Sequence, residues 1–240
     1  MLHHRIYLAS GFIAGEQISL SPQAARHVQV LRLQPGILIE LFDGAGGVCT
    51  ARIHHMGKHQ VDVTVEEVHL RGSTDSNVRH IVVGMPANER MDWLVEKATE
   101  LGATRISPVM TQRSVLRLSG ERAEKRVEHW QGIAQAACSQ SGRNVLPIID
   151  LPTHLTQYLN DSENNTQDLK VVLSLQSGTR HWREMWQTPP LNVTLLSGPE
   201  GGLSPQEEQM ALDKGFIAAN LGRQVLRAET ASLAVLAQLL

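Results

Sequence analysis

Residues 193–208 read VTLLSGPEGGLSPQEE and set the architecture of this chain. The first five are apolar or small and predict a buried strand, and the glycines that follow let the backbone turn sharply. Ser204, Pro205 and Glu207 form a capping box with proline at the first helical position, so a helix begins there. The glycine spacing is neither that of a Walker A loop nor that of a dinucleotide fingerprint. Alone, the turn is more often structural than ligand-binding.

Short apolar runs recur on both sides of this stretch, and helical periodicity separates most of them. The runs are residues 79–84, 105–110, 145–150, 170–175, 193–197 and 216–221. One helical pattern ends at Gly102 and a second ends at Gly142. This alternation from residue 78 onward predicts an α/β domain with a mainly parallel sheet. Ligands of such sheets bind beyond the carboxyl ends of the strands.

Residues 1–70 are β-rich instead. Residues 36–44 predict a strand that runs into an Asp-Gly turn, residues 48–54 return antiparallel, and residues 61–65 alternate with period two. Ser21 and Pro22 predict the start of a short helix. The polar segment 71–77 is the expected linker. We therefore predict two domains, residues 1–72 and 73–240.

The composition of the 240 residues excludes several classes of protein. The chain is 42% hydrophobic with a net charge of −2, which is typical of a globular protein and not of a broadly basic nucleic-acid coat. Apolar runs are too short to span a membrane, and the first residues lack an apolar leader. Cys49 and Cys138 have no paired spacing, so we expect no disulfide, no metal site and a cytoplasmic location. His54, His55 and His59 surround a turn without acidic or cysteine companions.

Three further features concern charged and aromatic residues. One basic stretch could bind phosphates of a nucleic acid, or it could be the solvent-exposed start of a helix. Its members are Arg113, Arg117, Arg122, Lys125 and Arg126. Trp93 and Trp130 fall within helical patterns, and we expect both to be packing residues and not platforms for base stacking. Residues 221–231 form a loop that leads into an apolar helix expected to reach Leu240. Arg227 and Glu229 lie at the start of this helix, where they form either a helix cap with a salt bridge or a polar binding site above apolar residues.

Four motifs in order, spanning essentially the whole chain, resemble the RsmE family of ribosomal RNA methyltransferases in the trefoil-knotted SPOUT superfamily. They are residues 89–102 with 106–108, residues 140–143 with Pro147, residues 198–204, and residues 221–222 with 225–227 and 229–231. Residues 27–32 and 42–44 fit the family's PUA-like small β-barrel, which binds RNA. Cys138 departs from the pattern, because a polar or acidic residue is expected there.

The resemblance implies methylation of N3 of a uridine in 16S ribosomal RNA by S-adenosylmethionine. It also implies a knot, a homodimer and the small ribosomal subunit as partner; general topology rules alone would disfavour the knot. The loops after the strands at 170, 193 and 216 are expected to lie together around the cofactor. The implied cofactor-binding residues are Leu173, Ser174, Leu175, Leu196, Gly198, Pro199, Glu200, Gly201, Leu221, Gly222, Val225, Leu226, Thr230 and Ala231.

The chemistry of the acceptor suggests roles for charged residues. Uridine N3 carries a proton, so the enzyme needs a base or a way to stabilise the uridine anion, and the uridine must be unpaired. Arg227 is the candidate for anion stabilisation. Glu200 or Glu229 is the candidate base. Either carboxylate could instead bind and position Arg227, and the sequence does not separate the two roles. RNA contacts or surface salt bridges are expected of Arg5, Arg26, Arg32, Arg90, Arg113 and Arg143.

Two other functions compete with this hypothesis. One is a knotted methyltransferase acting on another RNA, such as a transfer RNA ribose, and the N-terminal barrel and the Glu89-Arg90 motif speak against it. The other is a non-enzymatic RNA-binding assembly factor, against which the intact cofactor loops speak. Cofactor binding discriminates the second directly.

Overall fold

The computed structural model describes residues 4–58, 60–70, 77–161, 168–186, 188, 190 and 192–240. These residues group into two compact units, one with residues up to 75 and 135–146, the other with 76–134 and 147–240. The predicted linker lies outside the described residues except for Asn77, as does the predicted boundary between residues 72 and 73.

The described part of the first unit contains a five-stranded sheet of order β1-β3-β4-β5-β2. Its elements are β1 (His4–Tyr7), β2 (Gln17–Ser19), α1 (Pro22–Val30), β3 (Leu38–Phe42), β4 (Gly47–Met56) and β5 (Val61–Leu70). The predicted antiparallel hairpin of β3 and β4 is confirmed. At its turn Asp43 Oδ1 accepts hydrogen bonds from the amides of Ala45 (2.7 Å) and Gly47 (2.9 Å). Ser21 caps α1, as predicted, by accepting from the amide of Ala24.

In its described residues the second unit has an eight-stranded, all-parallel sheet of order β11-β13-β10-β12-β6-β7-β8, with β9 also beside β7. Its strands are β6 (Arg79–Gly84), β7 (Arg105–Met110), β8 (Ile148–Ile149), β9 (Thr153–His154), β10 (Leu169–Leu173), β11 (Arg180–His181), β12 (Val193–Ser197) and β13 (Ile217–Asn220). Its helices are α2 (Asn88–Glu100), α4 (Leu155–Asp161), the short η1 (Trp182–Met185), α5 (Pro205–Asp213) and α6 (Ala228–Leu236). Helix α3 (Gly120–Ser141) contributes to both units. The predicted parallel α/β domain is confirmed.

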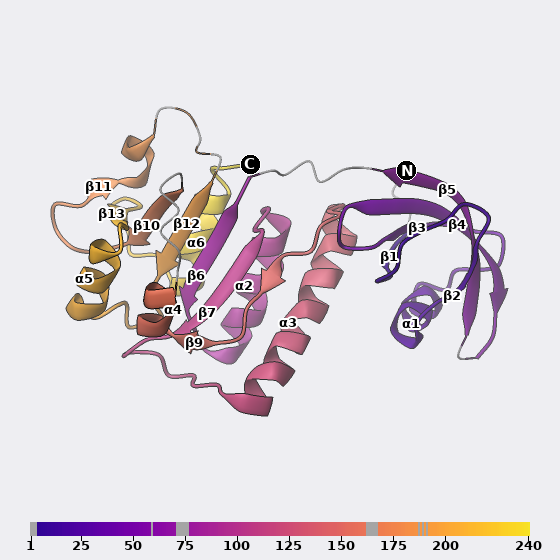
Figure 1. Ribbon diagram of the computed structural model, residues 1–240, viewed down its shortest axis with the longest axis horizontal. Helices are drawn as coiled ribbons and strands as arrows, with labels where there is room; N and C mark the ends of the chain where they lie inside the picture. The colour runs from indigo at the N-terminus through magenta and orange to yellow at the C-terminus, as the bar shows by residue number, and fades with distance from the viewer. Residues whose placement is uncertain are drawn as a thin grey trace. The chain divides into compact units, whose positions relative to one another are not determined.

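Helices cover both faces of this sheet (Figure 1). Side chains of a strand alternate between faces, so Ile81 and Val83 of β6 pack in a core with α2, α3 and α6. Val82 packs in a second core with α4 and α5. Because both faces are buried, the central strands read as continuous apolar runs.

Several predicted boundaries differ from the structure. The strand expected over 145–150 is reduced to β8, because Pro147 lacks the amide that a sheet ladder requires. The last helix ends at Leu236 with Ala237 as its C-cap, and Leu240 is exposed. The stops at Gly102 (φ +88°) and Gly142 (φ +82°) are confirmed. No helix among the described residues is both long and apolar enough to cross a membrane.

The expectation for the two tryptophans is right for one and wrong for the other. Trp130 is 1% exposed and donates to Asp92 Oδ1 at 2.9 Å. Trp93 is 44% exposed, because Met91, Leu94 and the other apolar residues of α2 already form the buried face.

Candidate functional site

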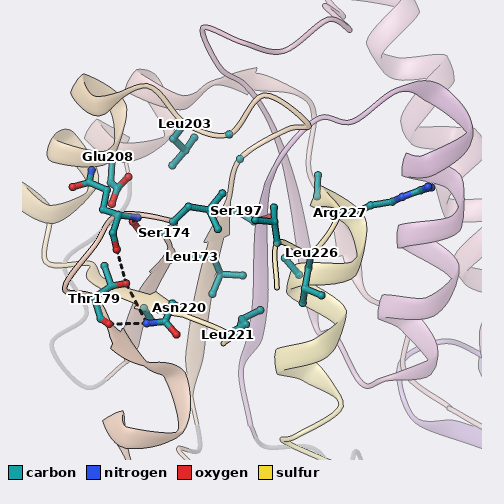
Figure 2. Close-up of a pocket in the computed structure, with 18 of the residues that line it drawn as sticks. Leu173, Ser174, Thr179, Ser197, Leu203, Glu208, Asn220, Leu221, Leu226 and Arg227 are labelled. Atoms are coloured by element: carbon teal, nitrogen blue, oxygen red, sulfur yellow. Dashed lines mark hydrogen bonds between the residues drawn. The ribbon is translucent and has the colours of Figure 1, made fainter. Parts of the chain in front are cut away.

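A cavity of about 1020 Å³ opens at the carboxyl ends of β10, β12 and β13. These strands are parallel neighbours in the sheet, so the loops that follow them meet. Residues 174–179, 198–203 and 221–227 line the cavity (Figure 2). The three loops therefore lie together as the sequence predicted.

Two glycines fix the path of the loop after β12. A Cβ on Gly198 would lie 2.6 Å from the carbonyl carbon of Gly202, so only glycine lets this loop fold back on itself. A Cβ on Gly84, at the end of β6, would lie 2.5 Å from Cδ of Pro199. Gly84 was not predicted as a site residue, yet it lets the glycine loop pack against the neighbouring strand.

Two arginines hold the same loop from either side. Arg113 Nη1 donates to the carbonyl oxygens of Gly201 (2.7 Å) and Leu203 (3.2 Å). Arg90 Nη1 donates to Glu200 Oε1 at 3.2 Å, and the same oxygen accepts from the amide of Ala87 at 3.0 Å. Both arginines line the cavity, and each has part of its guanidinium bound by the protein.

Asn220 connects the other two loops. Its Nδ2 donates to the carbonyl oxygen of Thr179 (2.6 Å) and to Thr179 Oγ1 (3.2 Å), and its Oδ1 accepts from the amide of Gly222 (3.1 Å). Figure 2 shows the bonds to Thr179 beside the cavity. Gly222 has φ +116°, which favours glycine at this turn. Asn220 therefore sets the relative positions of loops 174–179 and 221–227.

Arg227, at the N-terminus of α6, differs from Arg90 and Arg113 because no protein group binds it in the described part of the chain. Arg227 is the N-cap residue of α6, is exposed and lines the cavity. Within the described part of the chain its guanidinium has no hydrogen bond or ion pair. Glu229 is 6% exposed, lies outside the cavity lining and comes within 4.0 Å of Arg90 Nε. Both candidate carboxylates thus face Arg90, and neither holds Arg227.

Comparison of this chain with known proteins identifies the family to which it belongs. Residues 74–240 match the family model of an RNA methyltransferase domain, and residues 20–66 match that of an RNA methyltransferase PUA domain. A ribosomal RNA small subunit methyltransferase E from Synechocystis is 30% identical over 100% of this chain and 78% of its own length. The chain belongs to the ribosomal RNA small subunit methyltransferase E family.

Solved structures support this assignment to the methyltransferase E family. A methyltransferase from Legionella pneumophila with bound S-adenosylmethionine matches with a TM-score of 0.90 and 33% identity, covering 99% of this chain and 96% of its own. The family member from Neisseria gonorrhoeae, also with S-adenosylmethionine, matches with a TM-score of 0.89 and 32% identity, covering 98% and 96%. The N-terminal unit is PUA-like.

The structure brings most of the cofactor-binding residues expected of an E-family member to one cavity. Those that line it are Leu173, Ser174, Leu175, Gly198, Pro199, Glu200, Gly201, Leu221, Gly222, Val225, Leu226 and Ala231. Leu196 and Thr230 do not line it, and Leu196 packs in the core under α4 and α5. Gln176, Thr179, Glu208 and Asn220 line the cavity without having been predicted. For Gln176, Thr179 and Asn220 the only sequence signal is a polar residue at or beyond a strand end, and Glu208 lies in the first turn of α5.

The other arginines predicted to contact RNA belong to the first unit. Arg5 pairs with Glu40, stacks 4.9 Å from the centre of the Phe42 ring and donates to Asn144 Oδ1 at 2.7 Å. Its side chain is 8% exposed, which gives it a structural role. Arg26 and Arg32 are exposed, and Arg143 is half-buried with its carbonyl accepting from Arg5.

A second cavity, of about 520 Å³, opens at the opposite, amino-terminal edge of the sheet. His80 Nε2 lies 2.7 Å from Ser107 Oγ, which donates to Asp150, and Asp150 accepts from Arg105 Nε (2.8 Å) and Nη2 (2.9 Å). Burial, and next the charge of Arg105, lowers the pKa of His80 to about 4. Burial raises the pKa of Asp150, but bonds from Arg105 and Ser107 outweigh it and hold the pKa below its ordinary value.

A metal site needs several side chains that can bind the ion together. No group of three or more His, Cys, Asp or Glu residues suited to a metal ion occurs among the described residues, and His59 lies outside them. Cys49 and Cys138 are free thiols, and burial raises the pKa of Cys49 to about 12 and that of Cys138 to about 11.

Proposed function

We propose that this chain transfers a methyl group from S-adenosylmethionine to N3 of a uridine in the 16S RNA of the small ribosomal subunit. The observation that carries the proposal is the cavity where loops from three neighbouring strands and Arg227 meet. The names of the relatives and the S-adenosylmethionine in two similar structures support it.

The lining of the cavity fits this cofactor. Small-molecule sites measure roughly 300–1,000 Å³, and this cavity lies at the top of that range. Leu175 is 75% exposed and Val225 73% exposed on its wall, so an apolar, flat group such as adenine has surface to cover. Loop 221–227 belongs to no strand or helix, which leaves backbone groups of Leu221, Val225 and Leu226 for the adenine edge. When bound, S-adenosylmethionine supplies an activated methyl group.

We assign the handling of the acceptor to Arg227 and Glu200. A guanidinium offers paired planar donors, and that of Arg227 is free to stabilise the anion that forms over O2 and O4 of the uridine. Glu200 Oε1 is occupied by Ala87 and Arg90, whereas Oε2 has no partner in the described part of the chain. Glu200 lines the cavity and Glu229 does not, so we place the N3 proton on Glu200 Oε2.

The proposal extends to the rest of the molecule. We propose that Arg26, Arg32 and Arg143 of the PUA-like unit meet RNA phosphates, with additional contacts from unbound edges of Arg90 and Arg113. The family resemblance supports a homodimer, a knotted C-terminal segment, a functional division near residues 72 and 73, and action in the cytoplasm.

Labelled S-adenosylmethionine and small ribosomal subunits that lack the modification test the function. Reverse transcription maps the product, because a methyl group at N3 blocks base pairing and stops the polymerase. One new stop at a uridine is the expected result. Cofactor binding without label in the subunit would assign the enzyme to another RNA, and neither binding nor label would favour an assembly factor.

A further inference from the structure

Glu208 is a carboxylate that the fold leaves without a partner. It lies in the first turn of α5, is 8% exposed and lines the large cavity. Its backbone amide bonds to Ser204 as part of the helix start, but its carboxylate has no hydrogen bond or ion pair within the described part of the chain. A largely buried charge is costly unless a donor meets it.

Its neighbour Glu207 shows what a carboxylate with a structural role does at this helix start. Glu207 Oε1 accepts from the amide of Gln112 at 2.7 Å, and Oε2 accepts from the amide of Ser204 at 2.9 Å. Of the two glutamates, only Glu207 uses its carboxylate in the capping box and in holding the loop after β7. The carboxylate of Glu208 makes no hydrogen bond at the helix start, where its charge adds only a favourable interaction with the helix dipole.

The position of Glu208 in the cavity points to a ligand. In Figure 2, Glu208 and Ser174 lie on one side of the cavity and Arg227 on the other. If Arg227 marks the end where the methyl group is transferred, Glu208 faces a part of the cofactor away from the acceptor. S-adenosylmethionine carries donors there, namely its ammonium group and its two ribose hydroxyls.

We propose that Glu208 is a cofactor-binding residue whose carboxylate accepts hydrogen bonds from N–H or O–H donors of the bound S-adenosylmethionine. This inference rests on the proposed function. The carboxylate of Glu208 faces the cavity, and hydrogen bonds to a charged acceptor are stronger than neutral ones, so donors of a bound cofactor can replace the solvent there.

The test is calorimetric binding to Glu208→Gln, with Asp213→Asn as the matched control. Asp213 is an exposed carboxylate at the other end of the same helix. We expect Glu208→Gln to weaken S-adenosylmethionine binding at least tenfold and Asp213→Asn to leave it unchanged. The thermal midpoint of ligand-free Glu208→Gln should stay close to that of the wild type, because only the weak interaction of this charge with the helix dipole is lost.

Two analogues identify the donor. S-adenosylhomocysteine keeps both kinds of donor but not the sulfonium charge, and 5′-methylthioadenosine keeps the ribose but lacks the ammonium group. An equal loss for all three ligands assigns Glu208 to the adenosine part that they share, either the ribose hydroxyls or the adenine amino group, and a loss that spares 5′-methylthioadenosine assigns it to the ammonium group. Unchanged binding, a loss confined to S-adenosylmethionine, or a loss of affinity that only accompanies a large drop in the thermal midpoint would overturn the proposal. Failure of the wild type to bind would instead overturn the proposed function.

Discussion

Each edge of the parallel sheet has a cavity lined by polar side chains. The two edges differ in whether these side chains bind one another or have no partner. At the amino edge, His80, Ser107, Asp150 and Arg105 bind one another. At the carboxyl edge, Arg227 and Glu208 have no partner within the described chain, although Arg90, Arg113 and Asn220 are engaged in holding the loops. A satisfied network stabilises a fold, whereas unsatisfied groups around a cavity are available to a ligand.

The largest effect is expected from Arg227. Arg227→Ala should lower the rate of methyl transfer by about 10²–10³, the usual result of removing one preorganised donor from a developing anion. Cofactor affinity and the thermal midpoint should change little, because the guanidinium contacts nothing in the described protein. Single-turnover assays with saturating cofactor measure the rate, and Arg227→Lys should recover only part of it.

A loss of folding stability in Arg227→Ala equal to its loss of activity would contradict this contrast between the edges. It would mean that Arg227 belongs to a structural network like that of the amino edge.

His80 should affect stability and its pH dependence instead. Folded His80 remains neutral down to about pH 4, whereas the unfolded side chain takes up a proton near pH 6.5. Unfolding therefore binds a proton between these values, so the free energy of unfolding should fall by about 3 kcal/mol as the pH drops from 6.5 to 4. Below pH 4, lost ionisation of Asp150, whose pKa is lowered in the fold, should reduce stability further.

Denaturant titrations of His80→Gln at pH 6.5 and 4.5 check this expectation. The variant should lose most of the His80 contribution to the pH dependence while retaining cofactor affinity. The control is His154→Gln, since His154 is exposed. A pH dependence identical to that of the wild type would show that His80 is not the group responsible.

A smaller effect on cofactor affinity, accompanied by some loss of stability from overpacking, should follow from Gly84→Ala. The new Cβ would displace Pro199 and with it the glycine loop, so we expect about tenfold weaker binding, equivalent to about 1.4 kcal/mol. The matched control is Gly132→Ala within α3, where a Cβ meets nothing within 4 Å. That control should raise stability by about 0.5–1 kcal/mol. Equal affinities of the two variants would show that the loop tolerates displacement.

Sequence predicted the parts of the fold that local patterns specify. The capping box at Ser204, the glycine stops after α2 and α3 and the apolar strands β6, β7 and β12 all follow from residues close together in the chain. Strands β1 and β11 were not predicted, because each is short and depends on pairing with a strand 35–39 residues away.

The same limit applies to the site. The glycine loop and the loop before α6 carry motifs, so their residues were predicted. Asn220 works through Thr179, which lies 41 residues earlier in the chain, and Gly84 works through Pro199. Such roles arise only when the sheet brings the strand ends together. Arg90 belongs to a family motif and Arg113 to a basic stretch, and neither signal reveals that the protein itself binds part of each guanidinium.

Hydrogen–deuterium exchange with and without S-adenosylmethionine tests the central claim most directly, because it reports which edge of the sheet the cofactor contacts. We predict added protection in residues 174–179, 198–203 and 221–227, and unchanged exchange in residues 148–151 at the amino edge. Protection confined to the amino edge, or none in the three loops at saturating cofactor, would contradict the account.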